Sequence, residues 1–239
     1  MNLPVFYEKR EIVTPGDLLA DDDYQTGENT YKEDGKIYAT RVGLVEYEGH
    51  RVFVVALKAF YVPSVGDMVI GKIIELGLGS WLVDIRAPYP GVLRASDVFN
   101  RPFRPQRDDM PHVLDVGDMV KAKIVAYDRT RAPLLTVREP DLGKIERGQI
   151  VNITPTKIPR VIGRKGSMIT MLKQETNCQI TVGQNGVVHV RGGSPVDEQL
   201  AVIAIHKIEE EAHTSGLTDR VTQMVRKEKG GVENVSKEA

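Results

Sequence analysis

The sequence predicts a multidomain α+β protein, with a small N-terminal all-β domain, a small closed β-barrel and a mixed module in the order β-α-α-β-β-α. Three observations support this prediction. Short stretches rich in β-branched and aromatic residues, separated by turn signals, fill the first 139 residues. The motif Val65–Val69, Val-Gly-Asp-Met-Val, recurs at Val116–Val120, and each copy leads into an alternating strand. From Arg147 onward, helical patterns appear between the strands.

Residues 1–63 are expected to form the all-β domain. A strand is predicted over Ile37–Tyr47 and a returning strand over Arg51–Leu57, with a turn between them. The acidic stretch Asp21–Asp34 is expected to be a loop. This part holds 7 Lys and Arg against 11 Asp and Glu, a net charge of −4. An acidic domain repels anionic ligands, so we expect this one to contact protein.

Residues 64–139 are expected to form the barrel. Five short strands with turns between them are typical of such a fold, and they are predicted at Val69–Ile74, Trp81–Ile85, Gly91–Leu93, Val120–Val125 and Leu134–Val137. The stretch Asn100–His112 holds three Pro and three Arg and has no period. We therefore expect a long loop there, of the kind that is often functional.

Residues 140–229 are expected to form the mixed module, and residues 230–239 a flexible tail. Strands are predicted at Gln149–Ile153, Gln179–Val182 and Val187–Val190, and the last two are joined by an Asn185-Gly186 hairpin turn.

The helices of this module have recognisable start and stop signals. Pro159 is expected to open the first helix, and Ser167 to cap the second. Ser194-Pro195 is expected to start a long helix that ends at Gly216, and its predicted apolar face consists of Leu200, Ile203, Ala204, Ile208 and Ala212. A further short helix is predicted over residues 218–229.

Composition narrows the class of protein. No apolar run is long enough to span a bilayer, and the N-terminus has no secretory signal pattern. Cys178 is the single cysteine, which excludes intramolecular disulfides and thiolate metal clusters and fits a reducing compartment. We therefore expect a cytoplasmic protein with no membrane partner.

The net charge of −1 conceals two basic windows. Arg86–Arg107 holds five Arg and one acid, and Lys157–Lys173 holds five basic residues and no acid. Localised basic windows in a near-neutral chain indicate localised anion sites. The alternative interpretation is two solvated surfaces without a ligand.

The sharpest motif is Gly163-Arg164-Lys165-Gly166, between two predicted helices. Two glycines three apart let the backbone approach a ligand, and two cations at the tip suit a phosphodiester. The surrounding order of strands and helices is similar to that of the type I KH module, whose G-x-x-G loop clamps single-stranded nucleic acid. The resemblance implies RNA contacts from this loop and from Lys157 and Arg160. The alternative is a tight helix–helix turn.

The predicted barrel resembles the S1-type OB fold, through Gly71–Leu76, Ser80–Ile85, Gly91–Asp97 and Gly117–Ile124. OB folds stack bases on aromatic side chains beside a basic groove. The residues expected to contact RNA are Trp81, Tyr89, Arg94, Arg101, Arg104 and Arg107. The sequence departs from the family in having few aromatics on the strand face, and Trp81 could instead belong to the core.

No catalytic, metal-binding or cofactor-binding constellation is found. The five histidines show no H-x-x-x-H spacing, and the acidic clusters Asp21–Asp23 and Asp108-Asp109 lie in predicted loops. No nucleophile motif is present. We therefore expect no catalytic residues, metal ions or cofactors.

The order of the three parts resembles the archaeal exosome RNA-binding cap subunits, the ribosomal-RNA-processing protein 4 family. The resemblance also rests on Pro15–Leu19, Ala87–Tyr89, Pro159–Gly163 and Gly216–Arg220. It implies a non-catalytic subunit, three copies of which cap a six-membered ring of RNase PH-type subunits. It further implies that the first domain binds the ring, that the barrels pass 3′ ends of single-stranded RNA inward, and that the stretch Gly183–Gly186 is structural.

Two other classes of protein contain similar modules. A transcription factor of the NusA type also places a barrel before KH modules, but it has two KH modules in tandem. In polynucleotide phosphorylase a catalytic part comes first and the KH module precedes the barrel. The length and order of this chain favour the cap subunit over both.

Overall fold

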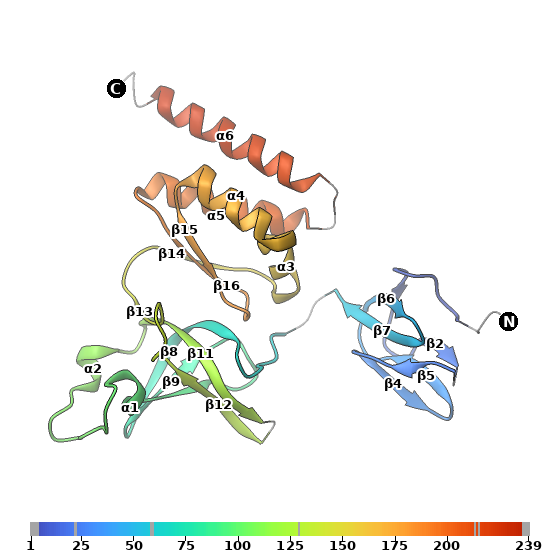
Figure 1. The fold of residues 1–239 in the computed structure, drawn as a ribbon, viewed down its shortest axis with the longest axis horizontal. Coiled ribbons are helices and arrows are strands. Elements are labelled where there is room, and N and C mark those ends of the chain that lie inside the picture. The colour runs from blue at the N-terminus through green and yellow to red at the C-terminus, as the bar shows by residue number, and fades with distance from the viewer. Residues whose placement is uncertain are drawn as a thin grey trace. The chain divides into compact units, whose positions relative to one another are not determined.

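The computed structural model describes residues 5–21, 23–57, 60–128, 130–212, 214 and 216–235, with side chains described as far as residue 229. The chain divides into two compact units between residues 59 and 60, and each is taken by itself below (Figure 1).

The first unit consists of two small sheets. One has the strand order β1-β6-β7-β3 and the other β2-β5-β4. Alternate residues of the longer strands, among them Val45, Val52 and Val54, are buried together with Leu19 and Ile37 in one core. The strands are β1 (Ile12–Val13), β2 (Leu18–Asp21), β3 (Gln25–Thr26), β4 (Thr30–Glu33), β5 (Lys36–Ala39), β6 (Gly43–Glu48) and β7 (Arg51–Ala56). The all-β prediction is confirmed.

Two details of that prediction are wrong. The single strand predicted over Ile37–Tyr47 is two strands, β5 and β6, which belong to different sheets. Gly43 begins β6 where a Cβ atom would lie 2.4 Å from the carbonyl oxygen of Val55, so the chain needs glycine there. The loop predicted over Asp21–Asp34 contains β3 and β4, because pairing with neighbouring strands outweighs the acidic composition. Asp22 lies outside the described residues.

The second unit begins with the barrel. Its strands are β8 (Met68–Gly77), β9 (Ser80–Asp84), β10 (Gly91–Arg94), β11 (Met119–Asp128) and β12 (Arg131–Thr136). The sheet closes because β12 pairs in parallel with β10 and antiparallel with β11. The closed five-stranded barrel is therefore confirmed. A further strand, β13 (Gly143–Ile145), pairs with β11, so the barrel sheet extends past residue 139.

The repeated Val-Gly-Asp turns fasten β8 and β11 to each other. In the first turn, the N–H of Gly66 donates to Ile124 O at 2.8 Å, and in the second, the N–H of Gly117 donates to Ile73 O at 2.8 Å. Both glycines have left-handed backbone, with φ of 97° and 100°, which favours glycine at these positions. The repeat therefore reflects two equivalent positions in the barrel.

The mixed module has the predicted order. It consists of β14 (Gln149–Asn152), α3 (Ile158–Ile162), α4 (Ser167–Thr176), β15 (Gln179–Val182), β16 (Val187–Arg191) and α5 (Pro195–Glu210). The antiparallel sheet has the order β14-β16-β15. A last helix, α6 (Leu217–Val235), packs against α4 and α5 (Figure 1). Short helices α1 (Ala95–Val98) and α2 (Met110–Val113) flank the arginine-rich loop of the barrel.

Several helix boundaries differ from the prediction. Ser194 caps α5 as predicted, because its Oγ accepts the N–H of Asp197 at 3.2 Å. Ser167 is the first residue of α4 and caps nothing; the capping position is Gly166, in left-handed backbone. The long helix α5 ends at Glu210, and Gly216 instead precedes α6. Helix α6 continues past the predicted end at residue 229, and residues 236–239 lie outside the described part.

The buried face of α5 is turned slightly from the predicted one. Leu200, Ala204 and Ile208 are buried as expected, but Ile203 is 44% exposed. Ala201 and Ile205 take its place in the core. The core-facing stripe is therefore centred nearer 201 and 205, which the apolar pattern alone does not distinguish.

The barrel and the mixed module are joined by the hairpin turn between β15 and β16. Asn185 is fully buried, and its Nδ2 donates to the carbonyl oxygens of Ile70 at 2.7 Å and Ile85 at 3.0 Å. Its Oδ1 accepts the N–H of Ile70 at 3.3 Å. In return, Arg86 reaches from the barrel to the carbonyl oxygen of Gly186 at 3.4 Å. The structural interpretation of this turn is confirmed, with an added role between domains.

No helix among the described ranges is long and apolar enough to cross a bilayer.

Candidate nucleic-acid interface

The loop between α3 and α4 has the geometry that close backbone approach requires. Gly163 and Gly166 have φ of 76° and 78°. A Cβ atom on Gly163 would lie 2.6 Å from the backbone nitrogen of Met168, so no other residue fits there. At the tip, Arg164 and Lys165 are exposed, and neither has an ion-pair partner in the described part of the chain. The loop thus presents two uncompensated cations to solvent.

A cavity of about 720 Å³ adjoins this loop. One side is formed by Arg160, Gly163 and Arg164, which the sequence predicts as RNA contacts. The other side is formed by the start of α6, including Thr218 and Asp219, which are not among the predicted site residues. These two residues belong to the Gly216–Arg220 motif, which supports the family resemblance but by itself does not indicate a binding site. Lys157 precedes α3 in a half-buried 3-10 turn and does not line this cavity.

The arginine-rich loop of the barrel is held by one buried carboxylate. The side chain of Asp108 is only 2% exposed. Its carboxylate accepts hydrogen bonds from both terminal nitrogens of Arg101, at 2.5 and 2.9 Å, and from the backbone N–H of Arg104, at 2.7 Å. The Arg101 guanidinium, more than any other group, lowers the pKa of the Asp108 carboxyl. Arg101 also lies 5.5 Å from the ring centre of Phe99.

The four barrel arginines predicted to contact RNA therefore differ in whether their charge is already paired within the protein. The charge of Arg101 is compensated by Asp108, so its main effect is to order the loop. Arg94, Arg104 and Arg107 are exposed. No ion pair involves any of these three in the described ranges, so their charges remain available to a phosphate.

The prediction that Trp81 contacts RNA is wrong. Its side chain is fully buried in the barrel core, and its indole N–H donates to Leu114 O at 2.8 Å. It alternates inward along β9 with Val83, so no base can stack on it. Tyr89 is 58% exposed and is the accessible aromatic of the predicted set.

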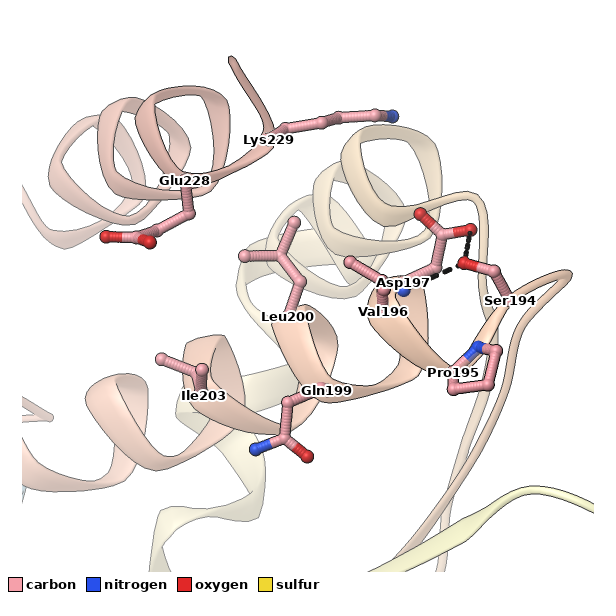
Figure 2. Close-up of a pocket in the computed structure, with 9 residues that line it drawn as sticks. All are labelled: Ser194, Pro195, Val196, Asp197, Gln199, Leu200, Ile203, Glu228 and Lys229. Atoms are coloured by element: carbon pink, nitrogen blue, oxygen red, sulfur yellow. Dashed lines mark hydrogen bonds between the residues drawn. The ribbon is translucent and has the colours of Figure 1, made fainter. Parts of the chain in front are cut away.

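A second groove, of about 520 Å³, lies between the start of α5 and the later turns of α6. Figure 2 shows its apolar floor, formed by Pro195, Val196, Leu200 and Ile203, with Glu228 and Lys229 opposite. None of the residues predicted to contact RNA lines it. It includes Ile203, the side chain that the sequence pattern had assigned to the core.

Among the side chains that the structure describes, no group of three or more His, Cys, Asp or Glu is arranged to hold a metal ion.

Comparisons with known proteins agree with this three-part architecture. Residues 10–58 match the family of the exosome RNA-binding protein Rrp4 N-terminal domain, residues 60–126 the Rrp4 S1 domain, and residues 148–207 the KH domain. A crystal structure of a protein assigned as an exosome RNA-binding protein is 50% identical, with a TM-score of 0.69. The alignment covers 72% of this chain and 98% of that one.

The similarity to archaeal proteins extends over nearly the whole chain. The exosome complex component Rrp4 of Aeropyrum pernix is 47% identical over 91% of this chain and 94% of its own length. The Rrp4 component of Methanobrevibacter smithii is 46% identical over 91% of this chain and 71% of its own. That of Pyrococcus abyssi is 43% identical over 98% and 91%. The chain therefore belongs to the archaeal Rrp4 family of exosome complex components.

Proposed function

We propose that this chain is a non-catalytic, RNA-binding cap subunit of an exosome, which holds single-stranded RNA and guides its 3′ end toward a ring of RNase PH-type subunits. The observation that carries the proposal is the exposed Gly163–Gly166 loop, whose two cations have no ion-pair partner in the ranges that the structure describes. The loop belongs to a KH domain that is hydrogen-bonded through Asn185 to an S1-type barrel. Two single-strand-binding modules in one unit can follow a strand over several nucleotides.

The RNA contacts are proposed to come from Arg160 and the loop in the KH domain, and from Tyr89, Arg94, Arg104 and Arg107 in the barrel. Lys157 would add charge beside α3. These groups contact phosphates or stack on bases, and such contacts by themselves carry little sequence preference.

The first unit is proposed to bind the ring, with three chains forming the cap, in the cytoplasm. Its net charge of −4 disfavours RNA, and its relatives carry the name of a component of a complex. Tyr61 packs in the barrel core and donates its hydroxyl to Asp67 at 2.6 Å. The ring-binding unit therefore ends before Tyr61, closer to residue 59 than to residue 63.

The purified chain alone is expected to leave RNA intact. Incubation with end-labelled poly(A), phosphate and Mg²⁺ should give no shortening on a denaturing gel, whereas the ring subunits under the same conditions should shorten the strand. Shortening that copurifies with the chain through successive columns would contradict the non-catalytic assignment.

Removal of the first unit is expected to separate the two proposed activities. A chain of residues 60–239 should no longer coelute with the ring subunits in size-exclusion chromatography, and it should bind single-stranded RNA nearly as tightly as the full chain. The cut at residue 59 keeps Tyr61 and so preserves the barrel core. Coelution of the shortened chain with the ring would place the ring contact in the barrel or KH domain instead.

A further inference from the structure

The cavity beside the Gly163–Gly166 loop has two chemically different sides. The loop side carries the cations Arg160 and Arg164, and the α6 side carries Thr218 and the carboxylate of Asp219. Its volume of about 720 Å³ lies within the range of sites that enclose small ligands, roughly 300–1,000 Å³. A phosphate would fit the cationic side, and a group that donates hydrogen bonds would fit the other.

The carboxylate of Asp219 has no protein partner in the described ranges. Neither an ion pair nor a hydrogen bond of its side chain is present, and the cations across the cavity lie beyond ion-pair distance. Two nearby carboxylates of this domain are paired: Glu211 forms an ion pair with Arg220 at 3.0 Å, and Glu175 forms one with Arg226 at 2.5 Å. Asp219 therefore keeps its full capacity to accept hydrogen bonds.

The backbone that carries Asp219 is firmly held. Leu217, Val221 and Val225 of α6 are buried in the core of the KH domain. The ion pair between Arg220 and Glu211 ties the first turn of α6 to the end of α5. A carboxylate on a fixed helix loses little conformational freedom when it binds, which makes it suitable for reading a ligand.

We infer that this cavity receives one nucleotide of the bound strand, and that Asp219 selects bases with an exocyclic amino group. The inference rests on the proposed function, because the loop must hold the strand. An ionised carboxylate only accepts hydrogen bonds, so it pairs with the amino group of cytosine. Uracil has a carbonyl oxygen at the same ring position, which a carboxylate repels. The one donor on the same edge of uracil, N3–H, lies between two carbonyl oxygens that repel a carboxylate, and the two bases are alike in size and stacking.

The test compares oligocytidylate and oligouridylate of equal length, by fluorescence anisotropy with the full chain at one salt concentration. The wild-type chain should bind the cytidine strand about fivefold more tightly, the lower end of what one base contact contributes. Asp219→Asn and Asp219→Ala should bring the two affinities within about twofold of each other. Glu210→Gln is the matched control, because it removes one exposed negative charge from the same domain, and it should keep the wild-type ratio.

The outcomes distinguish this inference from the proposed function. Equal wild-type affinities for the two strands would overturn the role of Asp219, as would an unchanged ratio in both Asp219 variants. If the strands bind but Arg164→Asp leaves the affinities unchanged, the loop does not hold the strand and this inference falls with it. A chain that binds neither strand would overturn the proposed function as well.

Discussion

Replacing Asn185 by Ala is expected to lower the free energy of unfolding of the unit that starts at residue 60 by about 3 kcal/mol. The side chain is fully buried and makes three hydrogen bonds to barrel backbone, two with Ile70 and one with Ile85. Alanine would leave two carbonyl oxygens and one N–H unpaired at a buried junction, and each such group costs about 1–3 kcal/mol. Urea denaturation followed by the fluorescence of Trp81, the single tryptophan, measures this unit specifically.

The neighbouring residue provides the control. Gln184 is exposed, and it contributes its backbone N–H to Met68 O at 2.8 Å, a bond that Gln184→Ala retains. This variant should change stability by less than about 0.5 kcal/mol. Asn185→Asp keeps the shape but places a charge against two carbonyl oxygens, so it should destabilise at least as much as Ala. A loss below about 1 kcal/mol in both Asn185 variants would show that water replaces the side chain without penalty.

The role of Asn185 illustrates what local sequence patterns can and cannot predict. Asn-Gly between two strands predicts a hairpin through the left-handed conformations that both residues tolerate, and the hairpin is present. This turn preference would be enough to explain why an asparagine stands at position 185. Its contacts, however, lie 115 and 100 residues away in the chain. They depend on how two folded domains meet, which no pattern within the hairpin encodes.

The errors among the predicted site residues have a similar origin. An aromatic residue on an alternating strand faces either the barrel interior or solvent, and the closure of the sheet decides which; for Trp81 it is the interior. Arg101 is predicted to contact RNA only because it lies in an arginine-rich window. Its pairing with Asp108, seven residues later, depends on how the loop folds back. The Gly163–Gly166 loop was predictable, because its glycines, cations and flanking helices are adjacent in sequence.

The side of the cavity formed by α6 was not predictable, because its residues are distant in sequence from the Gly163–Gly166 loop. About 50 residues separate Asp219 from the loop, and the two are brought together only when α6 packs against α4 and α5. The sequence indicated a short amphipathic helix there, which is the element that forms. Whether α6 lines a cavity depends on how it packs against α4 and α5. The apolar pattern of a helix predicts which of its faces is buried, but not which residues lie opposite its exposed face.

Changing Arg164 and Lys165 together to Asp is expected to weaken single-stranded RNA binding by at least about tenfold at low salt, with the fold unchanged. Both side chains are exposed, and neither has an ion-pair partner among the described residues, so the core loses no contact. Lys165 has left-handed backbone with φ of 52°, which Asp tolerates better than most residues. Two cations beside phosphates become two anions, and attraction becomes repulsion.

The salt dependence gives the more specific result. Each phosphate contact on a single strand contributes about 0.7 to the slope of log K against log salt, so losing two should reduce the slope by about 1.4. Phosphates carry no base identity, so the two loop substitutions should lower the affinity without removing any contact to a base edge. Fluorescence anisotropy titrations at several salt concentrations measure both quantities, and circular dichroism verifies the fold.

A matched variant separates a local contact from a change in overall charge. Lys173 and Arg191 are also exposed cations of the KH domain, away from the loop in sequence, and their double replacement by Asp makes the same change in net charge. If the loop clamps the strand, this control should lose far less affinity than the loop variant and should keep most of the wild-type slope. Equal losses in the two variants would mean that RNA responds to the charge of the domain as a whole. The Gly163–Gly166 loop would then be no more than a connection between two helices.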